Sequence, residues 1–209
     1  MTKTVCLALT GASGMPYGLR LLECLLAAGC RVQLLYSQVA SIVARQEMDE
    51  DLPARASEAE AQLRLRFAAL PGRLDVYGRE EWFAPVASGS NPPDVMVVCP
   101  CTMGTLASIA QGLASNLIER AADVVLKEGR LLVLVPRETP FSAIHLENML
   151  RLARAGAVIL PPNPGFYHHP QNVSDLVDFV VARILDRIGV AHRLMARWGE
   201  ESDVGEDSA

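Results

Sequence analysis

The chain has 209 residues, which is enough for one domain with a sizeable core, and hydrophobic residues make up 50 % of it. Its formal net charge is −5, and because residues 200–209 carry five acids and no base, the rest of the chain is neutral. This balance leaves no basic stripe of the kind that binds nucleic acid, and no apolar run is long enough to cross a bilayer. The N-terminus lacks a signal-peptide pattern, so we expect a cytoplasmic protein without membrane or nucleic-acid partners.

Five largely apolar segments predict buried β-strands, at residues 4–10, 31–37, 94–100, 131–136 and 157–162. Stretches with helical character lie between and after them, at residues 15–28, 38–47, 57–68, from Thr102 onward and at 173–188. Strands that are apolar on both faces and alternate with helices predict an α/β fold. We expect a doubly wound, mostly parallel sheet flanked by helices, a Rossmann- or flavodoxin-like three-layer sandwich. One domain over residues 1–190 would be followed by an arm and a disordered acidic tail over 191–209.

The ligand site is predicted at one edge of this sheet, because ligands of open parallel sheets bind beyond the carboxyl ends of the strands. Five loops lie there and together hold hydroxyls, an arginine, a glutamate, two tyrosines and two histidines. Their sequences are TGASG (10–14), YS (36–37), PCTMGT (100–105), PRETP (136–140) and PPNPGFYHHP (161–170). We expect one polar pocket to be built from these loops.

The first, glycine-rich loop is typical of an anion site at a helix N-terminus, where backbone N–H groups and Ser13 would face a phosphate. An ordinary tight turn is the alternative. A P-loop is excluded because no lysine followed by serine or threonine comes after the glycines. A dinucleotide site is disfavoured because Tyr36 and Ser37 stand where an acid would hold the ribose, and the Tyr-x-x-x-Lys of short-chain dehydrogenases is missing. A mononucleotide such as FMN fits better.

Two other loops carry candidate residues that also have ordinary structural explanations. Thr102 and Thr105 could bind the same ligand, or Thr102 could simply cap the helix that follows. Arg137 and Glu138 come directly after a buried strand, where charges are costly unless they are used or paired. They would therefore serve the pocket or form a loop salt bridge.

The remaining candidates are weaker. Arg120 and Lys127 are two helical turns apart and could face one side, although solvated helix charges are the usual explanation. Trp82 lies in a loop-like stretch and would form a cavity wall or fill the core. His168 and His169 have no third metal ligand at a recognisable spacing, so no metal is expected. The five cysteines, an odd number, fit free buried thiols in a reducing compartment.

The motifs above belong to six longer segments that run in order from about residue 4 to Trp198. They are TGASGMPYGLRLL, ASGS, PCTMGTLASIAQGLASNLIERAADVVLKE, LVLVPRETPFSAIHLENML, GAVILPPNPGFYHHPQ and LVDFVVARIL. Together they resemble the flavin prenyltransferases, the UbiX-type enzymes. One departure is Thr102, where many members have serine, and the hydroxyl is retained.

This resemblance implies an enzyme that joins the dimethylallyl group of dimethylallyl phosphate to N5 and C6 of reduced FMN, without a metal. The product, prenylated FMN, would serve a UbiD-type decarboxylase as partner. Carried over by motif, FMN would be held by Gly11, Ala12, Ser13, Ser37, Thr102, Met103, Gly104, Thr105 and Arg137. The prenyl phosphate would be bound by Arg120, Lys127, Tyr167 and Arg183.

We expect catalytic roles for four side chains: the resemblance implies those of Glu138 and Glu47, and the chemistry of the reaction adds Ser13 and Trp82 as candidates. Glu138 would shuttle a proton, with Ser13 and the released phosphate as further relays for the proton lost from C6. Trp82 is the candidate aromatic wall for an allyl cation. Glu47 would reach the site of a neighbouring subunit in a homododecamer.

Two other functions stay open from the residues alone. A flavin-dependent decarboxylase of the related cysteine-decarboxylase group would be expected to carry a histidine after the second strand, and residues 37–47 contain none. An FMN carrier that delivers the cofactor to a partner would not need Lys127, Glu138 and Arg183 together.

Overall fold

The structure, a computed structural model, describes residues 2–48 and 52–195, and these form one six-stranded parallel sheet. The strand order is β3-β2-β1-β4-β5-β6, the order of a doubly wound fold. The strands are β1 (Thr4–Leu9), β2 (Arg31–Tyr36), β3 (Arg73–Tyr77), β4 (Val95–Cys101), β5 (Leu131–Pro136) and β6 (Val158–Ile159). The acidic tail and Trp198 lie outside the described residues.

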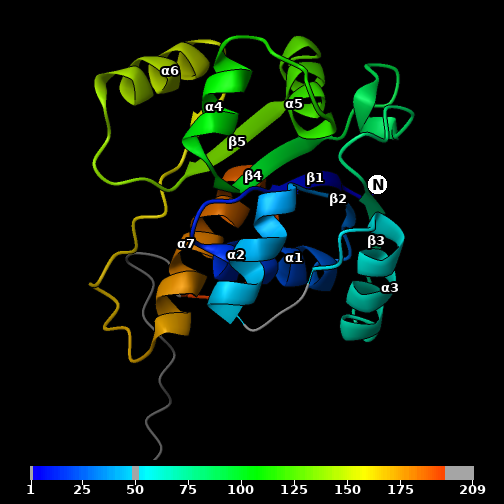
Figure 1. The fold of residues 1–209 in the computed structure, drawn as a ribbon. Helices are drawn as coiled ribbons and strands as arrows, with labels where there is room; N and C mark the ends of the chain where they lie inside the picture. The colour runs from blue at the N-terminus through cyan, green and yellow to red at the C-terminus, as the bar shows by residue number, and fades with distance from the viewer. Residues whose placement is uncertain (1, 49–51, 196–209) are drawn as a thin grey trace, which may run out of the picture.

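Helices cover both faces of the sheet, which makes three layers (Figure 1). On one face lie α1 (Met15–Ala27), α2 (Gln38–Met48), α3 (Ala56–Arg66) and α7 (Val173–Ile188). On the other lie α4 (Met103–Ala110), α5 (Leu117–Lys127), α6 (Ala143–Arg154) and the 3-10 turn η1 (Pro85–Ala87). None of the described helices is long and apolar enough to cross a membrane.

Each face of the sheet has its own apolar core, because successive side chains of a strand point to opposite faces. In β1, Val5, Leu7 and Leu9 pack with the layer of α1 and α7, whereas Cys6 and Ala8 pack with the layer of α4 and α5. All five side chains are fully buried. This two-sided burial explains why the strand is a continuous apolar run in the sequence.

The α/β sandwich and the limits of most elements agree with the sequence, and three differences have local causes. The sequence did not predict β3, an edge strand in which Arg73 and Asp75 alternate with apolar residues. The segment predicted as a strand over 157–162 pairs only at Val158–Ile159, and its two last residues are prolines, which have no N–H to donate. The helical stretch after Thr102 is two helices, with Gly112 at φ 72° directly after α4.

The strand order reverses between β1 and β4, which are hydrogen-bonded neighbours. The crossovers from these two strands leave toward opposite faces, to α1 and to α4 (Figure 1). A crevice therefore opens beyond their carboxyl ends, where open α/β sheets bind ligands. The loops after β1 and β4 are the glycine-rich loop and the PCTMGT loop of the sequence.

Candidate active site

The loops after β1 and β4 are tied together by Thr10, which is 1 % exposed. Its hydroxyl donates to the carbonyl oxygen of Pro100 at 2.8 Å and accepts the N–H of Thr102 at 2.8 Å. Its own N–H donates to the same Pro100 oxygen at 3.2 Å. The sequence assigned Thr10 to the first loop but predicted no separate role for it.

Both loops present backbone donors. Among the described residues, the N–H groups of Gly11, Ala12 and Ser13 have no acceptor, and neither do those of Met103 and Gly104 at the start of α4. Five such amides beside a switch point suit the phosphate or carbonyl oxygens of a ligand. The donor chemistry of the two loops therefore fits the FMN predicted from the sequence.

Two helices begin at this edge with hydroxyl caps. Thr102 accepts the N–H of Thr105 at 3.1 Å, and its hydroxyl donates to the Thr105 hydroxyl at 2.9 Å. Ser37 accepts the N–H of Ala40 at 3.1 Å at the start of α2. Capping by Thr102, one of the two alternatives that the sequence left open, is thus present, and it places both threonine hydroxyls beside the unpaired amides.

Gly11 and Gly18 are required by close approaches of the chain. A Cβ on Gly11 would lie 2.3 Å from Cγ1 of Val39 on α2, and one on Gly18 would lie 2.5 Å from the carbonyl oxygen of Cys99. The first contact holds the loop against α2, and the second holds α1 against β4. Any side chain at either position would push these elements apart.

Arg137 and Glu138, which follow β5, turn to different partners. The Arg137 Nε donates to the carbonyl oxygen of Ser13 at 3.3 Å. The Glu138 carboxylate accepts the N–H of Thr139 at 3.0 Å. The structure therefore brings Arg137 to the first loop, and it gives no support to a salt bridge between the two residues.

At the N-terminus of α1, the N–H groups of Gly14 and Met15 already have an acceptor, whereas those of residues 11–13 have none among the described residues. The carboxylate of Glu47, at the end of α2, accepts the N–H of Gly14 at 3.0 Å and that of Met15 at 2.8 Å. Met15 is the first residue of α1. A bound phosphate is therefore left with the amides of residues 11–13 and of α4, and Glu47 lies at the first loop of its own chain.

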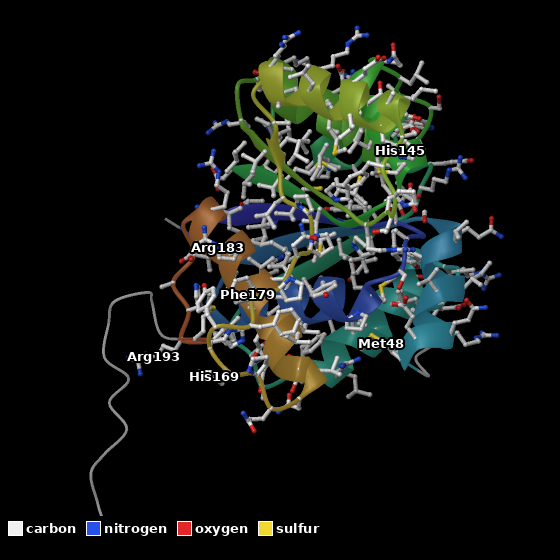
Figure 2. All side chains as sticks on the ribbon, turned by 90° about the vertical axis from the view of Figure 1, so that its left-hand side faces the viewer. Met48, His145, His169, Phe179, Arg183 and Arg193 are labelled. Atoms are coloured by element: carbon white, nitrogen blue, oxygen red, sulfur yellow. The ribbon has the colours of Figure 1, made fainter. Side chains whose placement is uncertain are left out.

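Tyr167 belongs to an aromatic cluster between the last loop and α7. Its ring meets Phe179 edge-on at 5.8 Å, and His168 stacks on Phe179 at 5.2 Å. Figure 2 shows Phe179 on α7 and Arg183 one turn further along, away from the loop that carries His169. The cluster sets the position of Tyr167, whose side chain is otherwise half exposed.

The hydrogen-bond partner of Arg183 is outside the two tied loops. Its guanidinium is 60 % exposed and pairs with Asp186 at 3.2 Å, and Asp186 also contacts Nε2 of His192 at 3.1 Å. The end of α7 is held at the opposite edge of the sheet, where the Lys3 ammonium donates to the carbonyl oxygen of Ile188. Arg183 thus extends from the outer face of the chain.

The two cations of α5 lie against one segment, residues 87–89. Arg120 Nε donates to the carbonyl oxygen of Ala87 at 3.0 Å, and Lys127 Nζ would be 2.6 Å from a Cβ on Gly89. Lys127 ends α5 four residues before β5 begins, so it lies near the amino edge of the sheet. Among the described residues, the hydrogen bonds of Arg120 and Lys127 go to partners other than Ser13 and Arg137.

Trp82 is 45 % exposed, which contradicts the alternative that its side chain fills the core.

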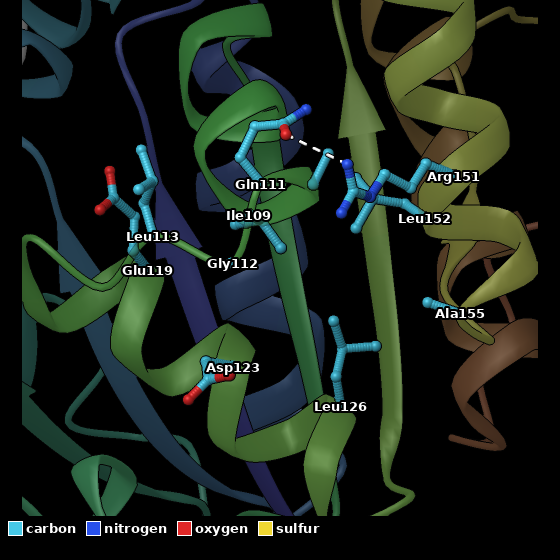
Figure 3. Close-up of a pocket in the computed structure, with 11 residues that line it drawn as sticks. Ile109, Gln111, Gly112, Leu113, Glu119, Asp123, Leu126, Arg151, Leu152 and Ala155 are labelled. Carbon is cyan, nitrogen blue, oxygen red and sulfur yellow. Dashed lines mark hydrogen bonds between the residues drawn. The ribbon is translucent and has the colours of Figure 1, made fainter.

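Two cavities of the described residues are lined by parts of the chain other than the two tied loops. One of about 660 Å³ opens between α2 and the loop after β3, and Tyr36, Arg45 and Arg79 are among its lining residues. A smaller one of about 210 Å³ lies between α4, α5 and α6, where Arg151 donates to Gln111 at 3.1 Å (Figure 3).

The cysteines and histidines of the described residues form no reactive or metal centre. All five cysteines are free thiols, and burial raises the pKa of Cys101 to about 12, so that thiol is protonated at neutral pH. Burial raises the pKa of Cys99 as well, and the neighbouring Cys101 acts in the same direction. No group of three or more His, Cys, Asp and Glu side chains could hold a metal ion in residues 2–48 and 52–195.

The family model Flavoprotein matches residues 1–185, so the chain is a flavoprotein, and the parallel sheet with its amide-lined switch point fits that class. Within that class, the sequence is 55 % identical over 203 residues to the flavin prenyltransferase UbiX of Pseudomonas aeruginosa, covering 97 % of each chain. It is 46 % identical over 195 residues to the UbiX of Halalkalibacterium halodurans, covering 93 % of each. The chain therefore belongs to the flavin prenyltransferase (UbiX) family, and it is a prenyltransferase.

Solved structures agree with this assignment. The crystal structure of AnUbiX (PadA1) in complex with FMN and dimethylallyl pyrophosphate is 39 % identical, with a TM-score of 0.85, and the match covers 97 % of this chain and all of that one. A dodecameric FMN-dependent UbiX-like decarboxylase from Escherichia coli O157:H7 is 41 % identical, with a TM-score of 0.83, and the match covers 94 % of this chain and all of that one. The cysteine decarboxylase TvaF, at 19 % identity and a TM-score of 0.57, shares the fold alone.

Proposed function

We propose that this chain joins the dimethylallyl group of dimethylallyl phosphate to N5 and C6 of reduced FMN and releases prenylated FMN. The observation that carries the proposal is the tie between Ser13 and Arg137 at the mouth of the switch point, beside five unpaired amides. The relatives named above support the reaction class, and the AnUbiX complex pairs FMN with a dimethylallyl phosphoester.

The flavin would lie across the loops after β1 and β4. Its phosphate and ring carbonyls would accept the N–H groups of residues 11–13 and 103–104, with the hydroxyls of Ser37, Thr102 and Thr105 around them. When bound and reduced, the flavin supplies the two nucleophilic ring positions. Arg137 would hold the first loop through the Ser13 carbonyl and present its remaining N–H groups to the flavin.

The chain would promote departure of the phosphate, because breaking the C–O bond leaves an allyl cation and a phosphate dianion. Arg120, Lys127, Tyr167 and Arg183 would donate to the phosphate oxygens as the charge develops there. Trp82 would face the cation with its aromatic ring. A pocket that excludes water would keep the cation from being hydrolysed.

Closing the new ring would require a proton to be added to the alkene that remains after the bond to N5 has formed, which leaves a cation for C6 to attack, and then the proton at C6 to be removed. Glu138 is the proposed proton shuttle: with Ser13 and the released phosphate it would supply the first proton and take up the second, so that the ring closure balances. The Glu138 carboxylate now accepts only the N–H of Thr139 among the described residues, so one of its oxygens is available for such a step.

A complete site would need more than one copy of this chain. Arg120, Lys127 and Arg183 lie on surfaces apart from Ser13 and Arg137, so a second copy would bring its cations to the first copy's flavin loops. The dodecameric relative from E. coli supports a homododecamer. Delivery of the product to a UbiD-type decarboxylase is proposed from family membership. The cytoplasmic location and the single domain over 1–190 stay predictions.

The proposal is tested by mixing the purified full-length protein with reduced FMN and dimethylallyl phosphate without oxygen, and then measuring the mass of the flavin. Dimethylallyl diphosphate is offered in a parallel reaction, since the sequence does not distinguish the two donors. We expect the mass of prenylated FMN with at least one donor. Unchanged FMN with both donors, despite tight FMN binding, would favour the carrier function instead.

A further inference from the structure

We infer that Thr10 is a positioning residue that holds the two amide-bearing loops in register around the flavin, an inference that rests on the proposed function. The argument begins with the tie itself. One buried hydroxyl donates to Pro100 and accepts from Thr102, both at 2.8 Å, so each hydrogen-bonding role of the oxygen is used across the switch point. No other side chain among the described residues makes a hydrogen bond between these two loops.

The hydrogen bonds of Thr10 lie between the two sets of unpaired amides, so they fix the distance between those sets. The three unpaired amides of residues 11–13 follow Thr10 directly, and the two unpaired amides of α4 follow Thr102 directly. A flavin that accepts from both sets needs their separation to be constant. Preorganised donors contribute most to binding because they do not have to be reoriented when the ligand arrives.

The paired register between β1 and β4 ends before the two loops. It runs from Val5–Val95 to Ala8–Val98, and the ladder between β4 and β5 shifts between Val98 and Cys101. Two residues beyond the last paired position of β1, the N–H of Thr10 donates to the Pro100 carbonyl oxygen at 3.2 Å. The Thr10 hydroxyl adds two shorter bonds to this backbone bond, one of which reaches Thr102 at the start of the second loop.

Thr10→Val tests this inference, because valine keeps the shape of threonine and removes only the hydroxyl. It leaves the N–H of Thr102 without its acceptor in a partly buried position. We expect the Kd for FMN to rise by about tenfold or more, measured by quenching of flavin fluorescence on the full-length protein. Thr10→Ser keeps the hydroxyl and should restore the Kd to within about threefold of the wild type.

Two controls separate positioning from general stability. Leu63→Val, in the core under α3, should lower the melting temperature without changing the Kd for FMN. Thr10→Ala also removes the hydroxyl, but without adding a second methyl branch, so it replaces Thr10→Val in the test if that variant does not fold. We expect Thr10→Ala to raise the Kd for FMN by about tenfold.

The inference is overturned if the variants without the hydroxyl bind FMN as tightly as the wild type, or if Thr10→Ser is as weak as Thr10→Val. If the proposed function is wrong, the experiments give a different result. In that case the wild-type protein itself makes no prenylated flavin, whatever the Thr10 variants do to FMN binding.

Discussion

The carboxylate of Glu47 accepts the N–H of Met15 at 2.8 Å within one chain, and so a residue at the end of α2 caps the start of α1. The same carboxylate accepts the N–H of Gly14 at 3.0 Å. An acid at a helix N-terminus is stabilised by the helix dipole as well as by these bonds. This places Glu47 next to Ser13 without a neighbouring subunit.

We therefore predict that Glu47 acts on the Ser13 of its own chain. Glu47→Ala and Ser13→Ala, each with its own affinity tag, are co-expressed and the mixed oligomers are purified through both tags. Every site then lacks either Glu47 or Ser13 if the two act within one chain, so no prenylated FMN should form. Recovered activity would show that Glu47 reaches a neighbouring subunit.

The control for subunit mixing is Ser13→Ala co-expressed with Arg120→Ala. Arg120 lies with Lys127 on a separate surface, at the carbonyl of Ala87, so it is proposed to serve the site of another copy. We expect part of the wild-type activity to return in these mixed oligomers, measured by the same mass analysis.

Glu138→Gln should keep FMN and lose turnover. The amide oxygen of glutamine can still accept the N–H of Thr139, so the loop after β5 should keep its shape. Because glutamine at this position cannot take up a proton, kcat should fall by about a hundredfold or more. Flavin titration and anaerobic turnover measure the two effects, and Glu147→Gln on the exposed side of α6 is the matched control. Normal turnover of Glu138→Gln would remove Glu138 from the mechanism.

Arg183→Ala should raise the KM for the prenyl phosphate by about tenfold or more and leave the Kd for FMN within about twofold. The reason is that Arg183 extends from α7, apart from the loops that would hold the flavin. Arg187→Ala, one turn further along the same helix, should change neither constant. An equal loss of prenyl phosphate and FMN binding would contradict the role assigned to Arg183.

Gly18→Ala should destabilise the FMN-free protein by about 1–3 kcal/mol, because the new Cβ would lie 2.5 Å from the Cys99 carbonyl oxygen. Gly104→Ala is the matched control, since its new Cβ would meet only the Thr102 hydroxyl, at 3.9 Å. Alanine also favours a helix over glycine, so this control should be neutral or slightly stabilising. Urea unfolding measures both, and equal effects would disprove the contact between α1 and β4.

Asp75 should make the free energy of unfolding depend on pH. Burial alone would raise the pKa of its carboxyl, but hydrogen bonds from Arg31 and Arg73 outweigh it and hold the pKa below the ordinary value. The ionised form therefore stabilises the fold above the ordinary pKa of an aspartate, and this contribution is lost as the pH falls through the lower pKa of the folded state.

Asp75→Asn should accordingly cost about 1–3 kcal/mol at pH 7, and the difference from the wild type should shrink in acid. Glu58→Gln is the control, because Glu58 forms an exposed pair with Arg55 and should change stability little. Urea unfolding between pH 7 and pH 3 checks the prediction. A difference that stays constant over this range would show that the charge of Asp75 does not matter.

The sequence by itself determined the class of fold, because strands buried on both faces must be apolar throughout. It also placed the candidate loops, since the chain order of strands and helices decides which loops reach the carboxyl edge. The edge strand β3 was missed because only a strand inside the sheet is buried on both faces, and the charges of Arg73 and Asp75 conceal its pattern.

Only the tertiary structure decided which of the candidate residues meet. Arg137 reaches Ser13 across 124 positions of sequence, and Thr10 reaches Thr102 across 92. It also gave the N–H groups of Gly14 and Met15 an acceptor in Glu47, and it paired Arg120, Lys127 and Arg183 with groups outside the two tied loops. Hydrogen bonds between distant segments depend on the register and packing of the whole sheet, and local sequence patterns carry no record of that register.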